Sequence, residues 1–143
     1  FFSTYSTSLG YLFDIIDSNY RIMANFHTDG KLRFRSLRLS DSSSFATYSL
    51  SALSPNQLYF LTWLHSNNSD SFFIDNVLQD SVSNFYSPSS NSTVYLGSNY
   101  TQSSFFNGSI SEFHLSNCAR DPSVPSSPFA PDSDSLSLLH FNG

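Results

Sequence analysis

The strongest constraint on the fold of this chain is a period of two in its hydrophobic residues. Over residues 19–27, NYRIMANFH, every second side chain from Tyr20 to Phe26 is apolar, and Leu32 and Phe34 repeat the pattern in the segment KLRFR. Such alternation is typical of a strand with one buried face, whereas a helix needs apolar residues three and four apart. Helical periodicity is nearly absent, and we therefore predict an all-β protein.

The turn between these two strands can be deduced from their faces, because directly opposed residues of an antiparallel pair share a face. A two-residue loop would oppose Phe26 to Arg33 and mix the faces, whereas a three-residue loop opposes Phe26 to Leu32. Three-residue loops favour glycine at their last position, which is Gly30 here. We predict this turn, with an outer face on which the opposed pairs are His27 with Lys31, Asn25 with Arg33, and Met23 with Arg35.

Two further segments predict where a strand is interrupted and where a strand is buried on both faces. After Ser36 the apolar set changes phase, because Leu37 and Leu39 continue it, and this indicates a bulge or the end of the strand. Residues 57–65, QLYFLTWLH, are almost continuously apolar. This run predicts a strand that is covered on both faces.

The rest of the chain continues in short strands. Residues 71–80 predict a hairpin around Asp75 and Asn76, which both tolerate positive φ. Strands are also expected over 92–97, 105–115 and the final SLSLLHF, while the segment 121–134, rich in Pro and Ser, predicts a linker or an extended strap. Many short strands in succession indicate a two-sheet sandwich or jelly roll.

Size and composition exclude several classes of function. The 143 residues suit one domain, and 15 Phe and 8 Tyr suit the space between two sheets. With only six Lys and Arg and a net charge of −5, a nucleic-acid partner is not expected. No apolar run reaches about 18 residues, so membrane insertion is not expected either. We expect the single cysteine, Cys118, to be buried. The chain begins without Met, and we expect it to be a piece of a longer protein.

The carboxy-terminal third carries a recognisable pattern. Residues 106–120, FNGSISEFHLSNCAR, resemble the laminin-G-like signature Phe-x-Gly-x-Ile-x-Glu-x-x-Ile-x-x-x-Ala-Arg, and VYLG over 94–97 and FIDNVL over 73–78 resemble other strands of that family. Asn76 stands where the family usually has Gly. The resemblance implies an antiparallel two-sheet β-sandwich (jelly roll) of the concanavalin A-like/laminin-G-like kind.

The same resemblance suggests a division of the chain and a setting for it. Residues 1–120 are expected to form the sandwich, 121–134 the strap or linker, and 135–143 a closing strand or the start of a following module. The segments PFAPD and LLHFNG near the end resemble the joint after such modules in tailed-phage fibres and other virion proteins. This implies a virion surface, or else an extracellular or cell-surface location.

Catalysis is not expected from these residues. Glucanases of the superfamily that the chain resembles use two Glu flanking an Asp on one strand. Here Glu112 is the only Glu, and its sequence context matches a structural position. No serine is flanked like the nucleophile of a hydrolase elbow. We therefore predict a non-catalytic recognition module.

Glycan binding is the leading hypothesis for what such a module recognises. Sugars need planar aromatic rings for their apolar faces and amide or backbone groups for their hydroxyls. The loop 98–102 offers Asn99, Tyr100 and Gln102, and Tyr86 lies in a second polar loop. The outer-face cations Arg33 and Arg35, with Arg21 nearby, are candidates for contacts with acidic sugars. Host-cell glycans are the expected partners.

Two alternatives stay open. Many laminin-G-like domains bind calcium at a loop rim, and Asp29 and Asp75 lie in predicted turns, although Asp favours turns in any case. The module could also be structural, packing between subunits of a capsid, tail or filament without binding sugar, because protein interfaces are themselves rich in Tyr and Phe.

Overall fold

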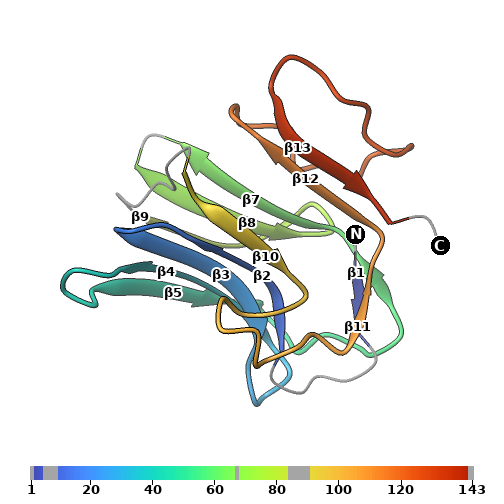
Figure 1. Cartoon of the computed structure of the whole chain (residues 1–143). Coiled ribbons are helices and arrows are strands. Elements are labelled where there is room, and N and C mark those ends of the chain that lie inside the picture. Colours follow the sequence, from blue (N-terminus) through green and yellow to red (C-terminus); the bar gives the residue numbers. More distant parts are fainter. Residues whose placement is uncertain (1, 5–9, 67, 84–90, 142–143) are drawn as a thin grey trace.

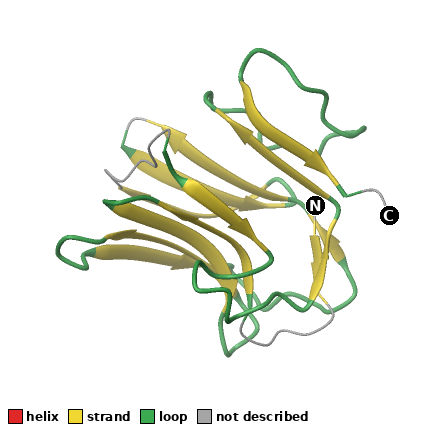
Figure 2. Cartoon of the chain, in the orientation of Figure 1, coloured by secondary structure: helices red, strands yellow, loops and turns green. Residues whose placement is uncertain are grey.

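The structure is a computed structural model that describes residues 2–4, 10–66, 68–83 and 91–141, and every regular element within them is a β-strand (Figure 2). In this part of the chain no helix is long and apolar enough to cross a membrane. The strands in chain order are β1 (Phe2–Thr4), β2 (Tyr11–Ile16), β3 (Tyr20–Phe26), β4 (Leu32–Arg38), β5 (Ser44–Tyr48), β6 (Leu58–Tyr59), β7 (Leu61–Ser66), β8 (Ser69–Ile74), β9 (Val77–Ser83), β10 (Thr93–Leu96), β11 (Gly108–Ile110), β12 (Glu112–Ser116) and β13 (Ser135–His140).

The strands form two layers, which confirms the sandwich prediction. One layer is a single antiparallel sheet in the order β10-β2-β3-β4-β5. The other layer is divided into the sheets β7-β8-β9, β11-β1-β6 and β12-β13, and the last of these is the orange and red hairpin at the upper right of Figure 1. At one side the layers are joined by a hydrogen bond of 2.5 Å from the Thr47 hydroxyl on β5 to the Asp80 carboxylate on β9.

The hydrophobic core lies between the layers, and six of the 13 buried residues described in it are aromatic. Phe26 and Leu32 are completely buried, and Phe34 is only 2% exposed. The ring of Phe34 lies 5.4 Å from that of Trp63 and 5.9 Å from that of Phe72, so it joins the five-stranded sheet to the opposite layer. Large side chains of this kind can fill the roughly 10 Å between two packed sheets.

The hairpin of β3 and β4 has the predicted register. Phe26 lies opposite Leu32, and Asn25 lies opposite Arg33. Gly30 has a φ of 78°, which a residue without a Cβ adopts at little cost, and its N–H donates to the carbonyl of His27. The predicted hairpin of β8 and β9 is also confirmed, with positive φ at both of its turn residues, Asp75 and Asn76.

Two predictions about strand interruptions need correction. No bulge follows Ser36, because β4 stays in register with β3 as far as the pair Tyr20 and Arg38, where the strand ends. The inner position is taken by Ser36 itself, which is 1% exposed. Residues 57–65 are not one doubly covered strand: they break between β6 and β7 at Phe60, and Leu58 is 56% exposed rather than covered.

The carboxy-terminal part also differs in detail. The predicted strand over 105–115 is two strands, β11 and β12, interrupted at Ser111. Cys118 is exposed rather than buried, because it lies in the turn that follows β12, where its carbonyl accepts a hydrogen bond from Ser116. Residues 121–134 contain no strand, as expected for a strap or linker, and β13 pairs with β12. The proposed module boundaries stay a prediction.

The aromatic core predicts a sharp contrast between two phenylalanines of adjacent strands. Phe34→Ala should lower the free energy of unfolding by about 3–5 kcal/mol, since it removes a buried ring that touches both layers. Phe45→Ala, at a position 40% exposed on β5, should cost about 1 kcal/mol or less. Urea unfolding of the two variants measures the difference, and equal losses would show that the core does not depend on Phe34.

Candidate functional site

The outer face of the five-stranded sheet carries polar and aromatic side chains in rows that cross the strands. Directly opposed residues share a face, so the alternation that sends Phe34 inward sends its neighbours outward. One row of opposed residues consists of Tyr11, Asn25, Arg33 and Tyr48. The adjacent row consists of Tyr95, Asp14, Met23, Arg35 and Ala46.

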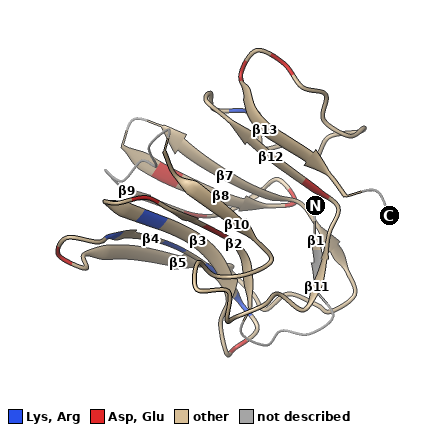
Figure 3. Cartoon of the chain, viewed as in Figure 1, with Lys and Arg blue, Asp and Glu red and all other residues tan. Residues whose placement is uncertain are grey.

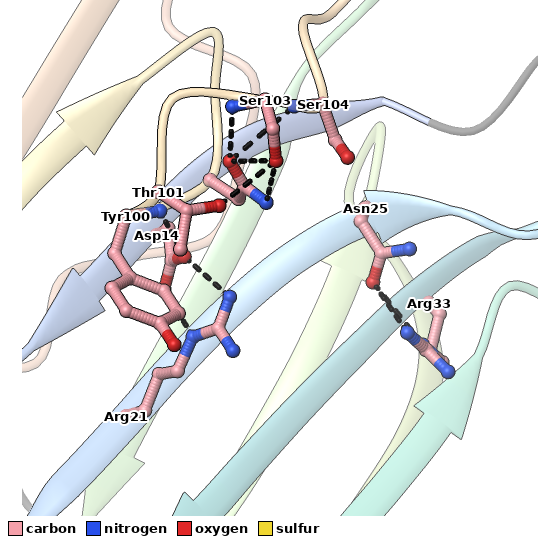
Figure 4. A network of polar contacts seen from close by, with 9 residues as sticks. Asp14, Arg21, Asn25, Arg33, Tyr100, Thr101, Ser103 and Ser104 are labelled. Atoms are coloured by element: carbon pink, nitrogen blue, oxygen red, sulfur yellow. Dashed lines mark hydrogen bonds and ion pairs between the residues drawn. The ribbon is translucent and has the colours of Figure 1, made fainter.

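The most buried polar group of this face is the carboxylate of Asp14 on β2, which is completely shielded from solvent. Arg21 on β3 binds it through two hydrogen bonds, from Nε to Oδ1 at 2.8 Å and from Nη2 to Oδ2 at 2.6 Å (Figure 4). The backbone N–H of Tyr100 donates a third, 2.8 Å long, to Oδ2. The carboxylate is therefore paired and well hydrogen-bonded, as a buried charge must be.

Two tyrosine rings lie against the Arg21 guanidinium. Its central carbon is 4.5 Å from the centre of the Tyr100 ring and 5.7 Å from that of the Tyr11 ring, both within the range of a cation–π interaction. Burial alone would lower the pKa of Arg21, but the hydrogen bonds and the charge of Asp14 outweigh it, so this pKa is raised. The positively charged guanidinium of Arg21 therefore packs against the ring of Tyr100. The Tyr100 side chain remains 44% exposed.

The loop that carries Tyr100 is held by its own polar groups. The side-chain oxygen of Asn99 accepts hydrogen bonds from the N–H groups of Ser103 and Ser104, and Gln102 adopts a φ of 55° while its N–H donates to the carbonyl of Asn99. Gly97 starts the loop with a φ of 72° and donates its N–H to the carbonyl of Leu12. These hydrogen bonds hold the loop in one conformation at the edge of the sheet.

The two cations of this face on β4, Arg33 and Arg35, have neutral partners. Arg33 donates from Nε and Nη2 to the side-chain oxygen of the buried Asn25, at 3.1 Å each, and Arg35 donates to the hydroxyl of Ser44. Among the described residues no carboxylate forms an ion pair with either guanidinium. Arg33 and Arg35 of β4 therefore carry positive charge on this face in a chain whose net charge is −5 (Lys and Arg are blue in Figure 3).

The residues predicted from the sequence fall into three groups. Tyr100, Arg33 and Arg35 share the outer face, with Arg21 between them. The amide of Asn99 is used within its loop, and Gln102 is exposed there. Tyr86 lies outside the described residues.

Calcium receives no support from the two predicted aspartates. Asp29 is in the β3–β4 turn, where it accepts a hydrogen bond from the N–H of Lys31 that lowers its pKa, and Asp75 is in the β8–β9 turn, where it accepts one from the N–H of Phe60. Calcium takes six to eight oxygen ligands. Nowhere in the described ranges do three or more His, Cys, Asp or Glu side chains gather in a way that could hold a metal ion. Asp29 therefore stabilises its own turn, and Asp75 links the β8–β9 turn to Phe60 between β6 and β7.

Sequence reasoning missed three members of the face, namely Asp14, Tyr11 and Tyr48. A signal for Asp14 is present, because a single carboxylate interrupts the otherwise apolar strand YLFDII and must find a cation if the strand is buried. Tyr11 and Tyr48 carry no comparable signal. Their places follow from the pairing of β2 with β3 and of β5 with β4, which the sequence does not specify.

The only glutamate holds the strap. Glu112 accepts a hydrogen bond from the N–H of Phe129 and lies 3.4 Å from Nδ1 of His140. Nearby, Arg120 donates two hydrogen bonds to Asp132, which hold the pKa of that carboxyl well below its usual range. These contacts give Glu112 a structural part, in agreement with its sequence context, while the absence of catalysis stays a prediction.

A laminin-G-type family model described as the concanavalin A-like lectin/glucanases superfamily matches residues 3–123, and the chain belongs to this family. Neither curated proteins nor solved structures give a significant match. The family includes modules that bind carbohydrates or take part in interactions.

The buried ion pair predicts a large effect at Arg21. Arg21→Ala should lower the free energy of unfolding by about 3–5 kcal/mol, because it leaves the Asp14 carboxylate buried without its cation. Arg35→Ala is the matched control, a cation of the same face whose partner is the hydroxyl of Ser44, and it should cost far less. Denaturant unfolding compares them, and equal losses would contradict the special role of the Asp14 carboxylate.

His114 on β12 predicts that the stability of the fold depends on pH. Burial, and then the charge of Arg120, lower the pKa of His114 below its usual value. The unfolded chain therefore takes up this proton at higher pH than the folded chain, so the contribution of His114 to stability is complete above about pH 6.5 and decreases as the pH falls towards the lower folded pKa.

An NMR titration of His114 measures this pKa directly. Arg120→Ala should raise it, because a nearby positive charge is lost, and Arg38→Ala, which removes a cation at the end of β4, should leave it unchanged. A His114 that titrates at or above pH 6.5 in the parent chain would refute the assignment.

Proposed function

We propose that this chain is a non-catalytic carbohydrate-binding module that holds glycans on the outer face of its five-stranded sheet. The observation that carries the proposal is the exposed ring of Tyr100, which lies on the same face as Arg33 and Arg35, two cations that form no ion pair with the described residues. Tyr100 is positioned twice, through its N–H on Asp14 and through its ring on Arg21. A ring held in this way presents a flat apolar surface to a sugar at little cost in side-chain entropy.

Arg33 and Arg35 favour glycans with acidic groups. Both guanidiniums lie on one strand of this face, and their present partners are neutral oxygens, which a carboxylate or sulfate could replace with a stronger, charge-assisted bond. Tyr48, opposite Arg33 and 39% exposed, extends the aromatic surface towards β5. Acidic sugars are therefore the class of ligand that the face suits best.

A setting on a virion appendage or another outer surface would suit such a module. A single shallow sheet face binds weakly, and several copies on one appendage would increase the avidity without any new contact. Host-cell glycans are the natural target in that setting. The support for this part of the proposal is the resemblance of residues 128–143 to joints in virion proteins.

A glycan array with the purified chain tests the proposal. Binding to acidic glycans is expected, with a decrease of at least about tenfold for Tyr100→Ala and for Arg33→Ala, and a further decrease at high salt because exposed charges are screened. Leu136→Ala, which removes a 63% exposed side chain on β13, is the matched control and should bind like the parent. Circular dichroism confirms that each variant is folded.

The structural alternative would give a different result. Several large apolar side chains outside the rows of the proposed face are exposed, including Leu58 and Val77, each 56% exposed. A chain that binds no glycan on the array but forms oligomers in solution through these residues would be an interaction module instead, and the carbohydrate proposal would be wrong.

A further inference from the structure

The layer opposite the five-stranded sheet has a short central strand. β1 pairs with β11 on one side, where Phe2 lies opposite Ile110, and with β6 on the other, where Phe2 lies opposite Tyr59. Both neighbours are interrupted one residue further on, β11 at Ser111 and β6 at Phe60, and both then continue as β12 and β7. The two interruptions therefore lie at the same level, where β1 begins.

Beyond that level no described strand lies between β7 and β12. In the described part of the chain β7 is the edge of its sheet, paired with β8 alone, and β12 is paired with β13 alone. Exposed edges of this kind present unpaired backbone N–H and C=O groups and accept another strand readily. β7 has six residues and β12 has five, so the facing edges have an ordinary strand length.

The space between these edges is a cleft of about 830 Å³. Its floor is the inner face of the five-stranded sheet, with Leu12, Phe13 and Ile15 from β2. Its walls include Trp63 of β7 and Phe113 of β12, and Phe129 of the strap contributes to its rim. The cleft is thus lined by apolar groups on the core side and by two strand edges at its sides.

Two residues of β7 that line this cleft carry buried polar atoms without a partner in the described part of the chain. Trp63 Nε1 and Thr62 Oγ1 are both buried, and neither has a hydrogen-bond partner among the described residues. Buried polar groups are nearly always hydrogen-bonded, and each exception requires an explanation. Both residues line the cleft, so a strand in it would lie beside them.

We infer that the cleft is a slot for one β-strand, antiparallel to both β7 and β12, and that its occupant is a segment that continues the chain directly ahead of β1. The register of β1 supports this occupant, because continuing it upstream places successive residues opposite the pairs Leu61 and Glu112, Thr62 and Phe113, and so on to His65 and Ser116. A segment in line with β1 has the required direction without any turn. This inference does not depend on glycan binding.

The same register fixes the pattern of the occupant. Phe2 points into the core and is 3% exposed, so every second residue upstream of it should point inward as well. The strand should therefore be five or six residues long and should alternate apolar with polar side chains, with the apolar ones facing the floor of the cleft.

An extended form of the chain tests the slot. The segment Thr-Val-Thr-Val-Thr-Val, added directly before Phe1, places each Val on the inward side. It should slow the hydrogen exchange of β7 and β12 backbone amides at least about tenfold, raise Tm by about 5 °C and change the fluorescence of Trp63, the single tryptophan. The matched control replaces each Thr by Pro, which cannot donate to a strand ladder, and should leave all three readouts at the values of the parent chain.

Three outcomes would overturn the inference. The first is that both extensions protect the β7 and β12 amides from hydrogen exchange equally, or that neither extension protects them. The second is protection by the same hexapeptide added as a free molecule but not when joined to the chain, which would make the occupant a separate partner. The third is a dimeric parent chain whose β7 and β12 amides are already protected, since a second copy would then fill the slot.

Discussion

The register of β3 against β4 is the constraint on which the rest of the structure depends. Gly30 closes a three-residue turn, and this turn sets Phe26 opposite Leu32. A shift of one residue would exchange the two faces of the hairpin, because side chains in a strand alternate strictly. It would turn Arg33 into the aromatic core and Phe34 out to solvent. One glycine therefore maintains both the core and the cationic face.

The ion pair of Asp14 and Arg21 extends this arrangement to the neighbouring strand and loop. Asp14 brings a charge into a buried position on β2, and the charge is tolerated because Arg21 and the N–H of Tyr100 satisfy it. Breaking the pair is costly, so the position of the Tyr100 loop is tied to the stability of the sheet. The exposed ring of Tyr100 is therefore held in place by the buried carboxylate of Asp14.

The sequence predicts local pairing well and distant pairing poorly. The β3–β4 and β8–β9 hairpins follow from alternation and turn residues, because both strands of each pair lie within a few residues of the turn. The pairing of β2 with β10, which places Tyr95 beside Asp14, joins segments about 80 residues apart and has no local signal. The same limit explains the candidate site: Arg33 and Arg35 could be found from their own hairpin, but Tyr11 and Tyr48 could not.

The two layers differ in completeness, and this difference bears on function. The five-stranded sheet is continuous and carries the proposed binding face on its outer side, whereas the opposite layer is divided at the level where β1 begins. If a strand upstream of β1 fills the cleft, it enters the layer that faces away from the tyrosines and arginines. The connection to the rest of a longer protein would then leave the binding face free, which is what a recognition module at the surface of a larger assembly requires.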